Sequence, residues 1–231
     1  SLQYVPDRFN TTEDLVELAT VAASYGGVYL THLRSESGAI DDALDETFAV
    51  AERAKIPAEI WHLKTAYKAN WGRMPAVLRR IEEARARGLD ITANQYPYTR
   101  ASNDLDSCLP TWVREGSAEQ MLARLKDPAL RARIKAEMGD SGAAGWENQW
   151  YGSGGGDGVM VASVLDAGLR KYEGMTLTEV GRAMGKDARD ALIDLVIADQ
   201  GQTACIISIM DEADVRAVDL SMRFEFDAPG T

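Results

Sequence analysis

The sequence predicts an α/β fold in which the first hundred residues form successive strand–helix–strand units of a parallel sheet. Runs rich in β-branched and aromatic residues indicate strands over residues 28–32, 58–62 and 90–96. Stretches with apolar residues at helical spacing separate them, so the strands recur about every thirty residues. Such alternation is typical of a doubly wound sheet or of a (β/α)8 TIM-type barrel. No glycine-rich phosphate-binding loop follows any of these strands, which favours the barrel.

The helices between these strands are expected from their end signals and apolar stripes. Thr11 and Asp14 form a capping signal, and Gly26-Gly27 ends the helix that follows. A second helix is expected over residues 40–51, and a third over residues 77–88. The second and third helices therefore each lie between two strands, as a parallel sheet requires.

The alternation stops after residue 100, and the chain divides into three predicted parts. Residues 1–100 hold the βα units of the barrel, residues 101–203 form an inserted helical segment or lid, and residues 204–231 return to the barrel. The later elements are expected in this order: an amphipathic helical stretch within 121–138, a glycine-rich loop over 145–158, a strand over 159–164, two helices between 176 and 199, an apolar run over 204–209, a helix over 211–218 and a final strand over 223–227. The glycine-rich loop lacks the Lys-Ser/Thr pair of a P-loop, so we interpret it as a flexible connection.

The composition excludes some classes of function. With 25 Lys and Arg against 36 Asp and Glu, the formal net charge is −11, whereas a nucleic-acid-binding protein needs a basic surface. No window approaches the roughly 18 uninterrupted apolar residues of a membrane span, and no basic, apolar leader is recognisable. Cys108 and Cys205 lie far apart without metal-binding spacing, so we interpret both as structural thiols. A reducing, cytoplasmic location is therefore expected.

The chain contains two histidines, and both lie at the ends of predicted strands. His32 stands in Thr31-His32-Leu33-Arg34, and His62 stands in Trp61-His62-Leu63-Lys64, one βαβ unit later. Adjacent parallel strands bring both imidazoles to the C-terminal mouth of a barrel, where barrel active sites lie. Since neutral imidazole is a preferred zinc ligand, we predict that both rings bind one ion. The alternative is that each ring only hydrogen-bonds to backbone, and in either case two ligands do not complete a metal site.

Three further residues are candidates for chemistry around such an ion. Asp227 ends the last predicted strand, where a carboxylate could bind the metal and act as a general base; an exposed turn aspartate is the alternative. Lys64, two residues past His62, would point to the mouth and hold a substrate carboxylate, unless it faces solvent. The hydroxyl of Tyr96 could donate to a carbonyl or carboxylate, although aromatic residues more often pack in the core.

Several segments resemble the N-acyl-D-amino-acid deacylases (D-aminoacylases) of the amidohydrolase superfamily. They are Leu2-Gln3-Tyr4-Val5-Pro6, Gly26-Gly27-Val28-Tyr29-Leu30-Thr31-His32-Leu33-Arg34, Trp61-His62-Leu63-Lys64, Gln95-Tyr96-Pro97-Tyr98 and Met210-Asp211-Glu212-Ala213-Asp214-Val215-Arg216. The paired histidine motifs in this order are fairly specific to the superfamily, and the Tyr-Pro-Tyr segment narrows the resemblance to the deacylases.

The resemblance implies a partial (β/α)8 barrel of the amidohydrolase kind, about strands 4 or 5 to 8, with a helical insertion before the last strand and Zn2+ as cofactor. The roles that it implies are metal ligands at His32 and His62, a general base at Asp227, and substrate-binding side chains at Lys64, Tyr96, Ser102 and Tyr4. Ser102 and Tyr4 are assigned by the resemblance alone. Around Asp227 the sequence departs from the family, because Phe226 and Ala228 stand where Ser or Thr and Gly are usual.

The expected activity is metal-dependent hydrolysis of N-acyl-D-amino acids, small molecules, to a carboxylate and a D-amino acid. The family's His-x-His pair and its zinc-binding cysteine belong to a half of the barrel that this sequence lacks, and neither Cys108 nor Cys205 matches that cysteine. The chain is therefore expected to need the missing N-terminal half, or self-association, and to be inactive alone. The alternatives are a cyclic-amide hydrolase of the dihydroorotase or hydantoinase kind, and a non-catalytic fragment that acts by association.

Overall fold

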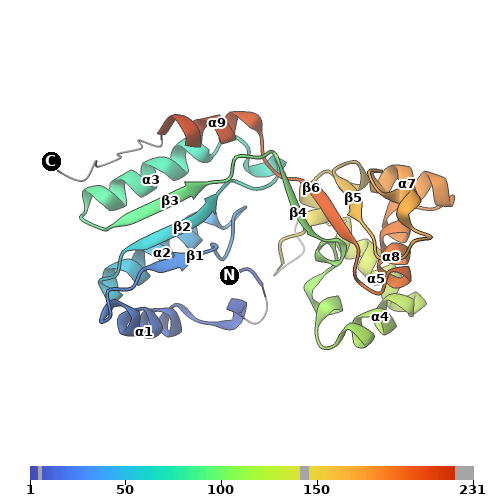
Figure 1. Cartoon of the computed structure of the whole chain (residues 1–231), viewed down its shortest axis with the longest axis horizontal. Helices are drawn as coiled ribbons and strands as arrows, with labels where there is room; N and C mark the ends of the chain where they lie inside the picture. Colours follow the sequence, from blue (N-terminus) through green and yellow to red (C-terminus); the bar gives the residue numbers. More distant parts are fainter. Residues whose placement is uncertain (5–6, 141–145, 222–231) are drawn as a thin grey trace. The chain divides into compact units, whose positions relative to one another are not determined.

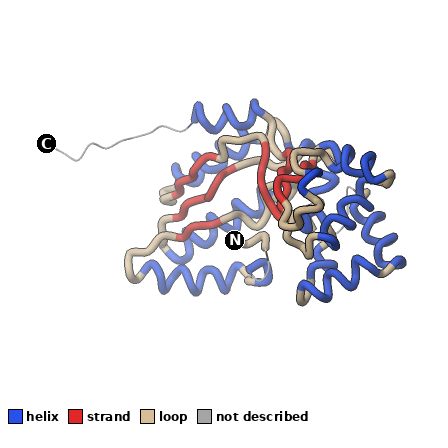
Figure 2. The backbone as a smooth tube through the Cα atoms, turned by 45° about the vertical axis from the view of Figure 1, so that its right-hand side comes forward, coloured by secondary structure: helices blue, strands red, loops and turns tan. Residues whose placement is uncertain are grey.

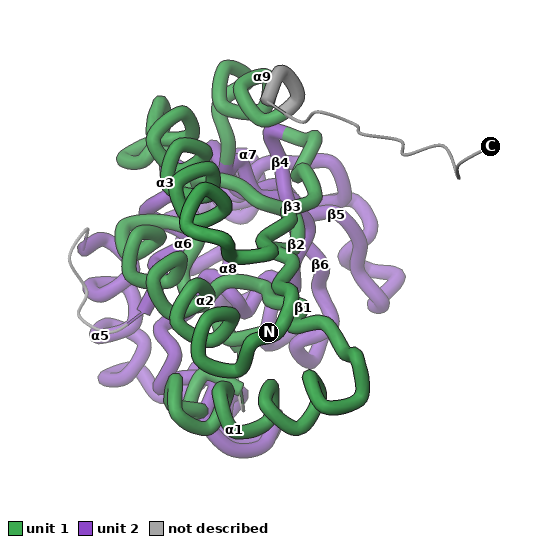
Figure 3. Tube along the Cα trace, turned by 90° about the vertical axis from the view of Figure 1, so that its left-hand side faces the viewer, with its two compact units in different colours: residues 1–98, 210–231 green, residues 99–209 purple. Residues whose placement is uncertain are grey.

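The computed structural model describes residues 1–4, 7–140 and 146–221. The chain forms two compact units (Figure 3). The first unit holds residues 1–98 and the segment that begins at Met210, and the second holds residues 99–209. Among the described residues, no helix is long and apolar enough to cross a membrane.

The first unit is built on a parallel three-stranded sheet in the order β1-β2-β3 (Figures 1 and 2). Its elements, in chain order, are α1 (Thr12–Ala23), β1 (Tyr29–Thr31), α2 (Ile40–Ala54), β2 (Ala58–Leu63), α3 (Met74–Ala86), β3 (Ile91–Gln95) and α9 (Glu212–Ser221). The three strands and three helices predicted for this stretch are thus confirmed. Consecutive strands pair side by side, as right-handed βαβ crossovers place them.

Local signals account for the helix boundaries of this unit. Thr11 caps α1, and its hydroxyl and the Asp14 carboxylate exchange hydrogen bonds with each other's backbone amides, the predicted capping box. Gly26 follows α1 with φ +71°, a conformation that glycine adopts without a steric penalty. α2 ends at Lys55, which adopts the left-handed conformation at φ 52°.

The two faces of the parallel sheet differ in what covers them. Figure 3 shows α1, α2 and α3 stacked along one face of the strands. Because side chains alternate along a strand, one set of side chains points to that face: Ala58, Ile60 and Ile91. All three are buried. On the other face Leu30 is 48% exposed and Trp61 is 45% exposed. Burial of apolar side chains under the helices stabilises this unit, and the second face remains accessible.

The second unit contains an antiparallel sheet in the order β4-β6-β5, packed with helices. Its elements are β4 (Arg100–Asp104), α4 (Ala118–Lys126), α5 (Pro128–Met138), α6 (Gln149–Gly152), β5 (Val159–Ser163), α7 (Leu177–Met184), α8 (Ala188–Ala198) and β6 (Ala204–Ser208). Its core includes Ile134, Val161, Leu192 and Cys205, all fully buried. Short 3-10 helices of the two units lie at Asp7–Phe9, Lys68–Asn70, Leu105–Cys108, Thr111–Arg114, Gly155–Asp157 and Arg170–Tyr172.

The limits of the second unit differ from those expected from sequence. The second unit begins at Thr99 and ends at Ile209, whereas the inserted part was expected at residues 101–203. The physical reason is that β6 does not join the parallel sheet but pairs antiparallel with both β4 and β5. β4 was not predicted at all, and the predicted final strand over 223–227 lies outside the described residues.

Candidate metal centre

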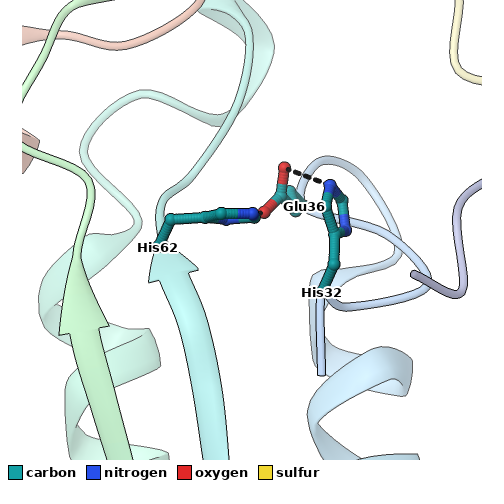
Figure 4. Close-up of side chains that lie close together, drawn as sticks. All are labelled: His32, Glu36 and His62. Atoms are coloured by element: carbon teal, nitrogen blue, oxygen red, sulfur yellow. Dashed lines mark ion pairs between the residues drawn. The ribbon is translucent and has the colours of Figure 1, made fainter. Parts of the chain in front are cut away.

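The two histidines meet at the carboxyl ends of neighbouring strands. His32 directly follows β1, and His62 is the penultimate residue of β2. Their ring centroids are 4.7 Å apart and the planes cross at 84°. Together with Glu36 they form a group whose ligand atoms all lie within 4.8 Å of one another (Figure 4). The structure thus brings the two predicted metal ligands together at one point.

The ring of His32 is oriented by a backbone carbonyl. Its Nδ1 lies 2.9 Å from the Leu33 oxygen, which can only accept, so Nδ1 carries a proton. Burial lowers the pKa of His32, although the nearby Glu36 carboxylate acts in the opposite direction. The ring is therefore neutral at neutral pH, and its Nε2 presents a lone pair, the form in which imidazole binds metal ions.

An irregularity in β2 determines the direction of the His62 side chain. The register between β2 and β3 shifts between Ile60 and Leu63, and His62 adopts φ 39°, an unusual value for a residue other than glycine. Its backbone amide donates to Asn94 Oδ1 on β3 (2.5 Å), and Asn94 Nδ2 donates to Glu59 Oε1 (2.7 Å). A β-bulge next to a functional site can redirect a side chain, and here it directs the imidazole to His32.

Glu36 belongs to this group, although no pattern in the sequence predicted it. Its carboxylate is buried, with Oε1 3.0 Å from His62 Nδ1 and Oε2 3.7 Å from His32 Nε2 (Figure 4). Burial raises the pKa of Glu36, but its hydrogen bond with His62 and the charge of Lys64 outweigh burial, so the pKa is lowered. The carboxylate is therefore ionised at neutral pH.

Lys64 also lies within this group. Its side chain is 4% exposed, and Nζ is 2.5 Å from Glu36 Oε1 and 2.7 Å from His62 Nδ1. The same Nζ lies 4.6 Å from the centroid of the Tyr96 ring, a cation–π contact. The solvent-facing alternative for Lys64 is therefore wrong. A buried ammonium stays charged only when it is paired, and Glu36 supplies the opposite charge.

Aromatic rings extend on both sides of the histidines. Tyr4 packs edge-on against His32 with the centroids 5.5 Å apart, and His62 contacts Tyr96 at 6.1 Å. Tyr96 in turn contacts Tyr98 at 6.0 Å. Two predicted substrate-binding residues, Tyr4 and Tyr96, thus lie next to the histidines.

The remaining predicted site residues, Ser102 and Asp227, lie outside the described part of the first unit. Ser102 is an exposed residue of β4 in the second unit, opposite Ile206 of β6. Asp227 lies outside the described residues. Cys108 and Cys205 are free, buried thiols of the second unit, as expected for structural cysteines. Contact with Cys205 and burial raise the pKa of Cys108 well above its usual value, so it remains a thiol.

The donor set fits a zinc ion. Zinc prefers imidazole nitrogen, thiolate and carboxylate oxygen, and catalytic sites use three protein ligands with one position open. The two imidazoles supply nitrogen ligands, and the ionised carboxylate of Glu36 lies beside them in a partly buried setting. Among the residues that the structure describes, one group of three such side chains converges in this way. Lys64 contributes no ligand atom while it is an ammonium, but it balances the charge of Glu36.

Two curated proteins are similar to part of the chain. An N-acyl-D-glutamate deacylase of Alcaligenes xylosoxydans xylosoxydans is 38% identical over 104 residues, which are 45% of this chain and 21% of that protein. A D-aminoacylase of the same organism is 37% identical over 102 residues, or 44% of this chain and 21% of that protein. No model of a protein family matches the chain.

Solved structures of deacylases share the fold. A D-aminoacylase, described as defining a novel subset of amidohydrolases, aligns with 93% of this chain at a TM-score of 0.61 and 25% identity. An N-acyl-D-glutamate deacylase from Bordetella bronchiseptica, complexed with zinc and a phosphonate inhibitor, aligns with 94% at a TM-score of 0.64 and 22% identity. The chain covers 35% of each of these proteins. The resemblance to the N-acyl-D-amino-acid deacylases is thus confirmed, for a chain that spans about a third of the solved relatives.

Proposed function

We propose that the chain is the C-terminal part of the catalytic barrel of a zinc-dependent N-acyl-D-amino-acid deacylase. The observation that carries the proposal is the convergence of His32, His62 and Glu36 at the carboxyl ends of parallel strands, in a chain similar to deacylases. In α/β barrels that edge of the sheet is where active sites lie.

The architecture that we propose is half of a (β/α)8 barrel. β1, β2 and β3 serve as consecutive barrel strands, and the face that carries Leu30 and Trp61 lines its interior. The second unit is the insertion that precedes the last strand of the barrel. Support comes from the parallel order of the three strands, from the helices on one face only, and from the exposure of the other.

The proposed reaction is hydrolysis of the amide bond, which yields a carboxylate and a D-amino acid. A zinc ion at this site supplies Lewis-acid chemistry towards the amide carbonyl and lowers the pKa of water to about 7. His32 and His62 would hold the ion through ring nitrogens. Lys64 binds the substrate carboxylate through its ammonium group, and Asp227 takes a proton from the attacking water and delivers it to the leaving nitrogen.

The aromatic and hydroxyl groups orient the substrate. Tyr96 and Tyr4 flank the histidines and present hydroxyl donors to the substrate carbonyl and carboxylate, and Ser102 adds a further donor. Because the chain has a net charge of −11, an anionic substrate needs such a local binding site.

The partner that we propose is the other half of the barrel. β1 and β3 are edge strands of the three-stranded sheet, and unpaired edges favour pairing with further strands. The isolated chain is expected to be inactive until an N-terminal half or a second copy completes it. From the two free thiols we also propose a reducing, cytoplasmic location.

The test measures bound zinc and the release of free D-amino acid from an N-acetyl-D-amino acid, with and without a co-expressed N-terminal half. We expect turnover only with that half, and its loss in the His32→Ala and His62→Ala variants. Full turnover by the isolated chain would contradict the proposed fragment. Ring opening of a hydantoin or dihydroorotate without N-acyl cleavage would favour a cyclic-amide hydrolase, and a chain that neither binds zinc nor turns over would be a non-catalytic fragment.

A further inference from the structure

We infer that Glu36 is a positioning residue that fixes both the ring of His62 and the ammonium of Lys64. The inference rests on the proposed function, because it assigns those two groups to the metal and to the substrate carboxylate. Glu36 would thus join the metal-binding and the carboxylate-binding parts of the site through one side chain.

The burial and contacts of Glu36 support this role. Its side chain is 9% exposed, and Oε1 approaches both Lys64 Nζ (2.5 Å) and His62 Nδ1 (3.0 Å). A buried carboxylate is stable only with such partners. The backbone holds Glu36 in place as well, because the Ala66 amide donates to the Glu36 carbonyl oxygen at 2.6 Å. The loop after β1 is thereby tied to the loop after β2.

The donors and acceptors around His62 show what Glu36 decides. An ionised carboxylate only accepts hydrogen bonds, and an ammonium only donates them. The Nδ1 of His62 lies 3.0 Å from Glu36 Oε1, which accepts, and 2.7 Å from Lys64 Nζ, which donates. If Nδ1 carries a proton it donates to Glu36, and if it lacks one it accepts from Lys64. Only the first arrangement leaves the Nε2 lone pair for a metal ion.

Glu36 therefore favours the tautomer of His62 that binds metal. Carboxylates that accept from the second nitrogen of a metal-binding histidine fix its tautomer and ring orientation in this way. The same oxygen also accepts from Lys64, so that the ammonium remains held over the Tyr96 ring. In Glu36→Gln the carboxylate charge is lost, the amide carbonyl is a weaker acceptor for Nδ1–H, and both the amide NH2 and Lys64 can donate to an unprotonated Nδ1, which favours the other tautomer.

The test compares Glu36→Gln with a matched control in the 231-residue chain. Glu46→Gln is the control, because the Glu46 side chain is 10% exposed, belongs to the same unit, is paired with Arg34 at 2.9 Å and is not a member of the group of His32, Glu36 and His62. Zinc affinity is measured by competition with a chromophoric chelator. The histidine tautomers are measured by 15N NMR, in which the two histidines give two ring systems.

We expect Glu36→Gln to weaken zinc binding by about 10–100-fold and to move His62 from the Nδ1–H to the Nε2–H tautomer in the zinc-free protein. Glu46→Gln should change neither. Equal affinity and unchanged His62 signals in Glu36→Gln would overturn the inference. So would a loss of zinc as complete as that of His62→Ala with an unchanged tautomer, since Glu36 would then be a ligand.

Two further outcomes separate the inference from the proposed function. If the unaltered chain binds no zinc, the proposed function fails, while the tautomer comparison in the zinc-free protein still decides the role of Glu36. If Glu36→Gln does not fold, the zinc-loaded unaltered chain decides it. There His62 must keep a proton on Nδ1, and zinc bound through Nδ1 would overturn the inference.

Discussion

At the scale of single residues, the placement of His62 depends on a side chain from the next strand. The Asn94 side chain accepts a hydrogen bond from the backbone amide of His62 and donates one to the Glu59 carboxylate. A positive φ outside glycine is unfavourable, so it persists only where neighbouring groups hold it. Asn94 supplies that restraint through one hydrogen bond.

Asn94→Ala is expected to remove this restraint. The bulged amide loses its acceptor, which costs about 1 kcal/mol of the free energy of unfolding. Zinc affinity should fall by about 10-fold because the ring is no longer held at His32. Urea unfolding and zinc competition check both effects. Thr92→Ala on the same strand is the control, and equal effects of the two substitutions would argue against a specific role of Asn94.

Part of the site could be predicted from residue spacing, and part could not. His32 and His62 stand out because each ends a strand-like run, one βαβ unit apart. Glu36 lies in the loop after β1, where no periodicity indicates which way a side chain points. The one signal in the sequence is its position four residues after His32, and that spacing carries information only within a helix.

At the scale of elements, α9 is attached to the rest of the first unit by a buried aspartate. Asp214 is 1% exposed, and its carboxylate accepts from the Thr65 hydroxyl (3.0 Å) and the Gly72 amide (2.8 Å). A third bond comes from the Met74 amide at the start of α3, at 3.3 Å. The segment that follows Lys64 is thus fastened to a helix that arrives about 140 residues later.

Asp214→Ala is expected to lower the free energy of unfolding by about 2–3 kcal/mol, because buried donors lose a charged acceptor. Chemical denaturation of the chain measures this change. Glu212→Ala on the same helix removes only an exposed pair with Arg216, and it should cost less than about 0.5 kcal/mol. Similar losses for the two variants would contradict the role given to Asp214.

The helices α5 and α8 of the second unit are joined by an ionic network. Asp190 on α8 pairs with Arg131 (2.8 Å) and with Lys135 on α5. Burial raises the pKa of Asp190, but the hydrogen bonds with Lys135 and Arg131 outweigh it, so the pKa is lowered. The folded state therefore binds this proton less readily than the unfolded state does.

Because the pKa of Asp190 is lower in the folded state, the free energy of unfolding that this network contributes depends on pH. The network stabilises the fold above the unfolded pKa, about 3.9, and its contribution is lost as the pH falls through the lower folded pKa. Asp190→Asn should cost about 1 kcal/mol at pH 7 and less at about pH 2. Unfolding curves at both pH values test it, and a cost that does not vary with pH would contradict the electrostatic account.

The elements themselves were predictable where local pattern and tertiary structure agree. β1, β2 and β3 are short apolar runs set off by helices, and a parallel sheet follows from that order. β4 was missed because Arg100-Ala101-Ser102-Asn103-Asp104 has a polar composition. It becomes a strand by pairing with β6, a hundred residues away, which no local pattern shows.

At the scale of the whole molecule, the chain is a pair of units of which the first carries the histidines. The described part of the chain supplies two imidazoles and a carboxylate from one parallel sheet and the loop beside it. His32 and Glu36 follow β1 whereas His62 belongs to β2, so the group exists only in the folded first unit. A metal ion bound there would therefore also stabilise that fold.

The central claim is that His32 and His62 share one cation. Competition titration of zinc against a chelator, with the unaltered chain, His32→Ala, His62→Ala and the double variant, tests it most directly. Two ligands of one ion act as a unit, so each single substitution should remove nearly as much affinity as the double substitution does. If the two losses add as independent effects, or if the double variant binds zinc as tightly as the unaltered chain, the two rings do not hold a common ion.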